Sequence, residues 1–319
     1  MSKGKKWITA AMIMVGTGLI ICIVSLAVLG FDFNKFSTVV YISKTCSIEE
    51  NFENISIDAD IEDIIFLPSD DKCCRISLYE EEKNPHYVMV EGDTLRVGRN
   101  NDKLQVNFGM VMDNPEIVIY LPKTAYGKIS IEGDTEDVEL PETIQFESIR
   151  VISDTGNVNC KSSASGKIFI KTGTGDINVS GVSASEIEAE SDSGRMDISD
   201  VKAADDVSVK EGVGDALLKN ISCRNLISKG DTGILEMTGV FASGEFRLER
   251  TTGDIEFDSC DAGSVYVKTD TGSVTGNLLT DKIFIPQTDT GNVDVPKTIT
   301  GGRCEITTGT GDIRIRTER

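Results

Sequence analysis

The sequence contains a single histidine, a single tryptophan and few aromatic residues, and no long amphipathic helical pattern follows its first 30 residues. With His86 as the only histidine, a Ser-His-Asp triad, a Cys-His pair and a histidine-based metal site are not expected. His86 follows Asn84-Pro85, so we expect an ordinary surface or partly buried residue in a loop. The sequence therefore predicts no catalytic residue, no cofactor and no metal ligand.

Positive charge is also scarce, because 32 Lys and Arg stand against 52 Asp and Glu and give a formal net charge of −20. Three of the basic residues, Lys3, Lys5 and Lys6, lie before the first apolar run, so the rest of the chain is more acidic still. Such a surface repels nucleic acid and anionic lipid headgroups. The partner classes that fit it are a basic protein or a cell-wall polymer.

One long apolar run stands out, because no residue from Trp7 to Leu29 is charged. Roughly 20 apolar residues cross a bilayer, whereas a cleavable signal peptide has an apolar region of about 7–15 residues. We therefore expect a cytoplasmic tail at residues 1–6 and an uncleaved transmembrane anchor at 7–30, with a cleaved signal as the alternative. The lysines keep the N-terminus in the cytoplasm, which predicts a single-pass protein of the cell membrane with an extracytoplasmic C-terminal part.

Glycine recurs with a period of 19 or 20 residues over most of the remaining chain. The positions are Gly156, Gly175, Gly194, Gly214, Gly233, Gly253, Gly272, Gly291 and Gly311, and an earlier repeat has Glu136 in the same place. Apolar residues recur seven and five positions before the glycine and two and four positions after it, as with Ile168, Ile170, Ile177 and Val179 around Gly175. Each repeat therefore contains two short strands joined by a turn at the glycine.

A single repeat cannot bury its apolar face alone, but repeats stacked about 4.8 Å apart close one long core. We predict an all-β fold, a right-handed parallel β-helix-like solenoid of ten 19–20-residue rungs over residues 129–319. Residues 31–128 lack the repeat and are expected to form a β-rich N-terminal cap. The last strand, from Asp312 to Arg319, is expected to be an open edge where rods associate end to end, with Arg314, Arg316 and Arg319 as residues that oppose such pairing. Pro286 makes the repeat at Gly291 irregular.

The cysteines do not follow the pattern of a disulfide framework. Cys160 and Cys304 fall on inward positions of the repeat, which indicates buried small apolar residues. Cys73 and Cys74 are adjacent, and whether Cys46 pairs with either of them stays open.

Every turn that has the glycine also carries one aspartate, either two positions before the glycine (position −2) or one position after it (position +1). The choice alternates along the chain except between Gly272 and Gly291. Carboxylates stacked in register about 5 Å apart would repel, so we interpret the alternation as staggering, with a row of cation sites as the rival interpretation. The predicted acidic binding row consists of Asp154, Asp176, Asp192, Asp215, Asp231, Asp254, Asp270, Asp289 and Asp312.

Three segments together resemble a known family. These are Thr172–Val179, Glu91–Val97 and Pro115–Pro122, and the set resembles the bacterial candidate-adhesin family of β-strand-repeat proteins, which is built on a domain of unknown function. The resemblance covers roughly residues 50–319. It implies a surface or envelope role and supplies no catalytic residue.

The tripeptide Asp-Thr-Gly, known from aspartic proteases, occurs at 154–156, 231–233, 270–272 and 289–291. Those enzymes need two such loops facing each other, whereas these copies recur at the repeat period and are better explained as turns. The main hypothesis is a non-enzymatic, membrane-anchored envelope protein that presents an acidic solenoid for adhesion or partner binding. The alternatives are an accessory or sensor in envelope-stress signalling and a carbohydrate-active β-helix enzyme.

Overall fold

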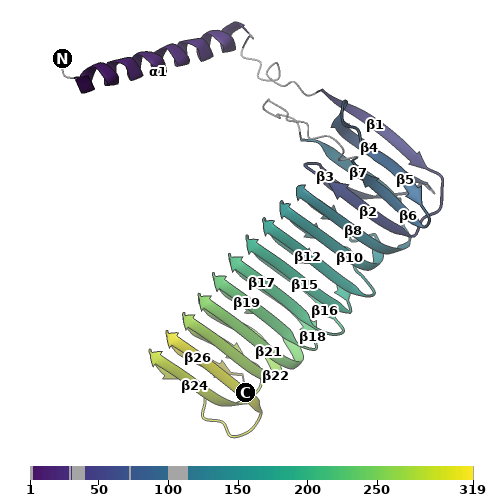
Figure 1. The fold of residues 1–319 in the computed structure, drawn as a ribbon. Coiled ribbons are helices and arrows are strands. Elements are labelled where there is room, and N and C mark those ends of the chain that lie inside the picture. Colours follow the sequence, from purple (N-terminus) through teal and green to yellow (C-terminus); the bar gives the residue numbers. More distant parts are fainter. Residues whose placement is uncertain (1–2, 29, 31–39, 72, 100–113, 319) are drawn as a thin grey trace.

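The computed structural model describes residues 3–28, 30, 40–71, 73–99 and 114–318. It consists of an N-terminal helix and a long stack of strands (Figure 1). Helix α1 (Lys3–Val28) includes Trp7–Val28, which has a mean hydropathy of 2.5 and is not buried against the rest of the protein. By length and composition this segment can cross a membrane, either as an anchor or as a signal sequence.

The strand that precedes each turn forms the first side of the stack, and neighbouring rungs pair in parallel. In spatial order, this side consists of β8 (Ala125–Thr135), β10 (Gln145–Thr155), β12 (Lys167–Thr174), β15 (Glu186–Ser193), β17 (Val207–Val213), β19 (Leu226–Thr232), β21 (Phe241–Thr252), the end of β22 (Ile255–Thr271), β26 (Gly302–Thr310) and β24 (Lys282–Thr290). The predicted β-solenoid is therefore confirmed.

The strand that follows each turn forms the second side. In spatial order it consists of β9 (Val138–Leu140), β11 (Val158–Cys160), β13 (Ile177–Ser180), β16 (Met196–Ala203), β18 (Ala216–Cys223), β20 (Leu235–Thr238), the start of β22, β23 (Val274–Leu278), β27 (Ile313–Thr317) and β25 (Val293–Asp294). A shorter third side, which the glycine repeat did not reveal, contains β14 (Ser183–Ala184) paired with the end of β16.

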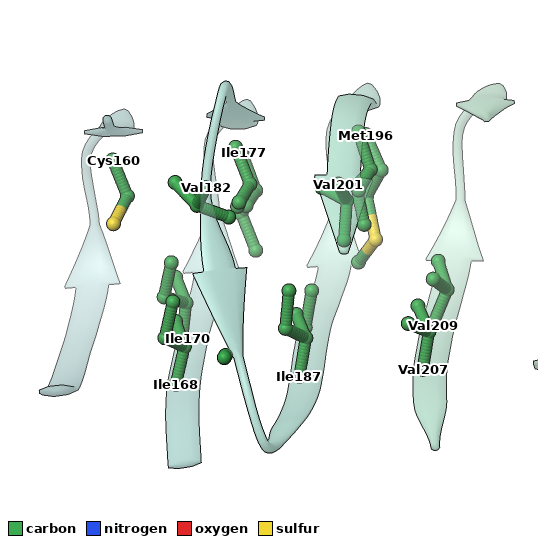
Figure 2. Packing of buried hydrophobic residues seen from close by; sticks show 14 of the residues in the cluster. Cys160, Ile168, Ile170, Ile177, Val182, Ile187, Met196, Val201, Val207 and Val209 are labelled. Carbon is green, nitrogen blue, oxygen red and sulfur yellow. The ribbon is translucent and has the colours of Figure 1, made fainter. Parts of the chain in front are cut away.

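The core is built from inward side chains stacked in register from rung to rung. Ile168 pairs with Ile187, which pairs with Val207, and all three are fully buried. Figure 2 shows these residues with Ile177 and Met196, which come from the strands after the turn, and with Val182 and Val201 of the third side. Apolar residues on all three sides therefore close a continuous core.

The turn needs glycine for two reasons, which Gly175 illustrates. Its φ is +149°, a conformation that residues with a side chain rarely adopt. In addition, a Cβ atom there would lie 2.0 Å from the carbonyl oxygen of Gly156 in the preceding rung. The glycine repeat is thus imposed by the close approach of stacked turns.

At the N-terminal end the stack continues past the first repeat. Two parallel levels lie beyond β8 and β9, and they consist of β2 (Asn54–Ala59) with β3 (Asp63–Ser69), followed by β6 (Thr94–Gly98) with β7 (Glu116–Pro122). Antiparallel strands cover them, namely β5 (Tyr87–Glu91), β4 (Cys74–Glu81) and β1 (Tyr41–Ile48). These levels contain no turn glycine of the repeat.

At the other end, the last two rungs are exchanged in space relative to their order in the chain. Strand β27 pairs with β23 on one side and with β25 on the other, and β26 likewise lies between β22 and β24. The prediction that the C-terminal strand is the open edge is therefore wrong, because the outermost strands are β24 and β25. The reason lies in the side chains: β26 contributes the fully buried Cys304 and Ile306, whereas β24 contains Pro286, which suits an edge strand.

All eight cysteines are free. Cys160 and Cys304 are fully buried, which confirms their inward positions, and burial raises the pKa of the Cys160 thiol to about 12. Cys46 lies opposite Ile76 in the β1–β4 pair and is not bonded to another cysteine. The buried thiols act as small apolar side chains.

Candidate binding surface

The nine predicted aspartates lie on one ridge, along the turns between the first and second sides, but they fall into two classes. Those at position +1 accept a hydrogen bond from the backbone N–H of position +1 in a neighbouring rung. Asp176 accepts from Arg195 at 2.7 Å, Asp254 from Ser273 at 2.7 Å, and Asp215 from Ile234 at 2.9 Å. These carboxylates therefore tie one turn to the next.

Asp312 belongs to the same class and accepts from the backbone N–H of Asn292 at 2.7 Å. That hydrogen bond and the neighbouring Arg314 guanidinium hold the pKa of Asp312 below its ordinary value. Asn157 can play the same part, since its side-chain oxygen accepts from the N–H of Asp176 at 2.9 Å. Where position +1 ties two turns together, it thus needs an oxygen acceptor rather than a charge.

The aspartates at position −2 form a free aspartate column and have no such role. Their side chains are exposed, and within the described residues the structure gives them no hydrogen bond and no ion pair. The column consists of Asp154, Asp192, Asp231, Asp270 and Asp289.

The free aspartate column is evenly spaced. In spatial order the rung of Gly311 stands between those of Gly272 and Gly291, so Asp312 separates Asp270 from Asp289. The alternation of positions −2 and +1 is therefore unbroken in space from the rung of Gly156 to the rung of Gly291. Successive free carboxylates lie two rungs apart, which corresponds to about 10 Å.

A groove of about 420 Å³ runs beside this column over the middle rungs. Asp192, Asp231 and Asp270 lie along it, together with Lys210 and Lys229. Two glycines, Gly212 and Gly230, also line the groove. Its lining also includes Glu190, Glu249 and Lys268, so both signs of charge are present.

The floor of the groove contains a buried ion pair that replaces a regular feature of the stack. Elsewhere, the residue three positions before the glycine is Thr or Ser, and in every such rung except that of Ser153 it donates to the glycine carbonyl of an adjacent rung, as from Thr172 to Gly156 at 3.2 Å. In three consecutive rungs that position holds Glu211, Gly230 and Arg250 instead. Glu211 and Arg250 form an ion pair, and both side chains are inaccessible to solvent.

Gly230 makes room for this pair, since a Cβ atom there would lie 2.8 Å from Oε1 of Glu211 and 2.9 Å from Cζ of Arg250. Arg250 also donates from Nη2 to the Ser228 hydroxyl at 3.1 Å. Burial, opposed by the charge of Arg250, raises the pKa of Glu211 to about 7, and burial lowers the pKa of Arg250. The pair therefore carries a high desolvation cost.

A second buried cluster, at the N-terminal end, surrounds the only histidine. His86 is 3% exposed and lies 2.8 Å by Nδ1 from Oε2 of Glu80 and 3.5 Å by Nε2 from Oε2 of Glu62. Burial acts to raise the pKa of Glu62, but the hydrogen bond with His86 and the charge of Arg99 outweigh it and lower the pKa to about 2. The expectation of an ordinary surface or partly buried histidine is therefore wrong, because residues distant in sequence enclose it.

Glu136 takes the place of the turn glycine in the first repeat. Its side chain folds back over Gly133 into the space that Thr or Ser occupies in other rungs, and the residue is 1% exposed. Burial raises the pKa of Glu136 to about 8; the nearby Ser153 hydroxyl opposes this shift, and the charges of Asp134 and Asp154 add to it. At neutral pH this carboxyl group is mostly protonated.

The arrangement does not resemble a catalytic centre in the part of the chain that the structure describes. The four Asp-Thr-Gly copies follow one another along the same ridge and do not face each other. Among the described residues, no group of three or more His, Cys, Asp or Glu side chains is placed to hold a metal ion. The buried carboxylates lie beneath the surface, and the exposed ones are spread along the rod.

Comparison with known proteins identifies the family. The Toastrack DUF4097 family model matches residues 52–205 and 184–319. The fold search finds a candidate adhesin from Parabacteroides distasonis (12% identity, 87% of this chain and 98% of that chain, TM-score 0.49). It also finds a candidate adhesin from Bacteroides fragilis (15%, 86% and 97%, TM-score 0.40) and a candidate lipid-binding protein from P. distasonis (13%, 86% and 97%, TM-score 0.48). No curated protein matches. Because the family model covers most of the chain, the protein belongs to the Toastrack DUF4097 family.

Proposed function

We propose that the protein is a non-enzymatic, membrane-anchored envelope protein that binds a basic partner along the free aspartate column. Family membership supports a non-enzymatic surface protein in general. The span at residues 7–30 serves as the anchor, with the N-terminus in the cytoplasm and the solenoid outside. The acidic row is the adhesive surface, and of its two classes only the position −2 aspartates contact the partner.

The observation that carries this proposal is the contrast between the two classes of aspartate. Position +1 carboxylates are engaged by backbone N–H groups, as Asp176 is by Arg195. The free aspartate column is exposed and has no partner among the described residues, although the stack repeats it with the same regularity. An exposed carboxylate with no structural role is available for a ligand.

The spacing of the column favours an extended basic segment as the partner. Alternate rungs place carboxylates about 10 Å apart. A segment in the polyproline II conformation rises about 3.1 Å per residue with three residues per turn, so every third side chain lies on one face about 9 Å from the last. A segment with Lys or Arg at every third position would therefore meet Asp192, Asp231 and Asp270 in succession. Lys210 and Lys229, which also line the groove, can pair with acidic residues of the partner.

A binding assay on the full chain in lipid nanodiscs tests the proposal. The probes are two peptides of identical composition, one with lysine at every third position and one with the lysines clustered. We expect tighter binding of the regularly spaced peptide. Replacing Asp192, Asp231 and Asp270 together by asparagine should weaken it at least about tenfold, because three direct charge contacts are lost.

The chain offers a matched control with the same change in net charge. Asp176, Asp215 and Asp254 replaced by asparagine keep an oxygen acceptor at position +1, as Asn157 shows naturally. This variant should bind the spaced peptide distinctly better than the first. Equal losses in both variants would mean that only net charge matters, and no loss in either would refute the proposal.

A further inference from the structure

The outermost rung at the C-terminal end leaves backbone groups and apolar side chains uncovered. The tip, defined here as β24, β25 and residues 295–301, has a partner on one side only, since β24 pairs with β26 and β25 with β27. The other edge of β24 has no strand against it in the part of the chain that the structure describes. An edge of this kind presents free N–H and C=O groups to another chain.

Side chains at the tip are exposed where the same positions in inner rungs are buried. Val293 stands two positions after its turn glycine and is 46% exposed, whereas Ile177 at the same position of an inner rung is fully buried. On the outward face of β24, Ile283 and Ile285 are each 43% exposed, and Ile299 beyond β25 is 90% exposed. The tip therefore combines a free strand edge with the open end of the core.

The tip also differs from the rest of the molecule in charge. No residue from Ile283 to Thr288 is charged, while the chain as a whole has a net charge of −20. Two copies approaching by their flanks bring carboxylates together, but two copies approaching by their tips bring the uncharged part of β24 together, and the charged residues of the tip, Lys282, Asp289, Asp294 and Lys297, sum to zero. The tip thus combines little repulsion toward a second copy with exposed apolar side chains.

We infer that the tip binds the tip of a second copy of this chain about a two-fold axis, with the two β24 strands antiparallel. Such a contact is self-complementary, and it places uncharged side chains opposite each other on both faces of the strand pair. The open end of each core then covers the other, as successive rungs do within one chain. Pro286 lacks an N–H group, so the contact depends mainly on side-chain burial and less on a continuous hydrogen-bond ladder.

The placement of the tip gives this association a consequence for function. Strand β1, the first strand after α1 in the chain, lies at one end of the stack, and the tip lies at the opposite end (Figure 1). Two rods joined tip to tip therefore direct their anchors away from each other and connect two membranes. This consequence rests on the proposed anchoring, whereas the tip contact itself does not.

The test uses the full chain, one copy per lipid nanodisc, with mass photometry as the readout. We expect a species with twice the mass, formed more readily at high salt, because salt screens the repulsion between two acidic rods. Binding of a basic peptide has the opposite salt dependence, so failure of this inference and failure of the proposed function are distinguishable. Only single nanodiscs at every salt concentration would overturn the inference.

Variants locate the contact. Ile283→Lys together with Ile285→Lys places charges on the outward face of β24 at exposed positions, and the double-mass species should decrease at least about tenfold. The matched control is Val213→Lys, because Val213 is an apolar residue 56% exposed on the flank, and it should leave pairing unchanged. A loss in the control but not in the tip variant would place the contact elsewhere.

Vesicle tethering tests the membrane-bridging consequence. Two populations of neutral phosphatidylcholine vesicles with different dyes should cluster only when both carry the protein. Clustering with protein-free vesicles would show that the tip binds lipid instead, and would overturn the assignment to a second copy.

Discussion

Replacing Arg250 by threonine should destabilise the middle of the stack strongly, although threonine is the usual residue at this position. Arg250 and Glu211 are both inaccessible to solvent and form an ion pair across Gly230. Removing the guanidinium leaves the Glu211 carboxyl group buried without its cation. Breaking a buried ion pair in this way costs about 3–5 kcal/mol.

The loss should depend on pH, because Glu211 can take up a proton. Its pKa is already raised to about 7, against an ordinary value of 4.5, so in the wild type the folded state retains a proton between these values that the unfolded state has released. Stability therefore falls as the pH rises through this window. Without Arg250 the pKa of Glu211 rises further, so the destabilisation by Arg250→Thr should be larger at pH 8 than at pH 6.

Removing both charges should restore the stability that Arg250→Thr alone loses. In the double variant Glu211→Thr, Arg250→Thr, each hydroxyl can donate to a glycine carbonyl of an adjacent rung, as Thr172 does, and each such bond contributes about 1 kcal/mol. We expect a stability within about 1 kcal/mol of the wild type, or above it. Gly230→Thr becomes acceptable only in this background, since the atoms that a Cβ would meet belong to Glu211 and Arg250.

The assay is urea unfolding of the full chain in detergent, followed by circular dichroism, with amide hydrogen exchange to locate the loss at the turns of Gly214, Gly233 and Gly253. Lys229→Thr is the matched control, because its ion pair with Glu249 at 3.3 Å is half exposed and should contribute less than about 1 kcal/mol. The reasoning is refuted if the double variant is as unstable as Arg250→Thr alone. It is also refuted if Arg250→Thr costs no more than the control.

Two further predictions concern the turns. Glu136 retains its proton in the folded state up to about pH 8 against an ordinary 4.5, so between these values it should lower wild-type stability by at most about 1.4 kcal/mol per pH unit, in addition to the effect of Glu211. Glu136→Gln should remove this part of the slope in urea titrations, and an unchanged slope would contradict the pKa shift. Ser273→Asp should cost about 1 kcal/mol, because the new carboxylate lies one rung from Asp254 and from Asp312. Asp312→Asn should recover part of that loss, whereas a purely additive double mutant would show that the C-terminal rung does not lie beside the rung of Gly272.

The sequence was sufficient to predict the solenoid because each glycine answers a local requirement. Stacked turns approach so closely that a side chain cannot fit, and the apolar positions repeat with them. The two N-terminal levels lack this signature, so β2 and β3 could not be recognised as a rung. The enclosure of His86 could not be predicted either, because Glu62, which contacts it, lies between β2 and β3, and Arg99, which pairs with Glu62, follows β6.

The candidate site was only partly visible in the sequence. The nine aspartates could be identified, but whether a carboxylate is engaged or free depends on the direction of its side chain, as the contrast between Asp176 and Asp192 shows. The position of the groove, in contrast, is indicated by the sequence. Glu211, Gly230 and Arg250 depart from Thr or Ser in three consecutive repeats, and a charged pair separated by a glycine indicates two side chains meeting over an empty position.

The sequence also indicates the exchanged order of the last rungs. It does so at the one place where the alternation of aspartate positions fails along the chain. Asp270 and Asp289 both stand at position −2 in successive repeats, which would place two exposed carboxylates one rung apart if the rungs followed chain order. Inserting the C-terminal rung between them puts Asp312, at position +1, in the gap and restores the alternation. The apparent exception is thus the regular pattern read in the wrong order, and repulsion between like charges favours the exchanged arrangement over the sequential one. A break in the alternation of charged turn residues, next to a proline in a strand, therefore indicates where a solenoid of this kind inserts its last rung.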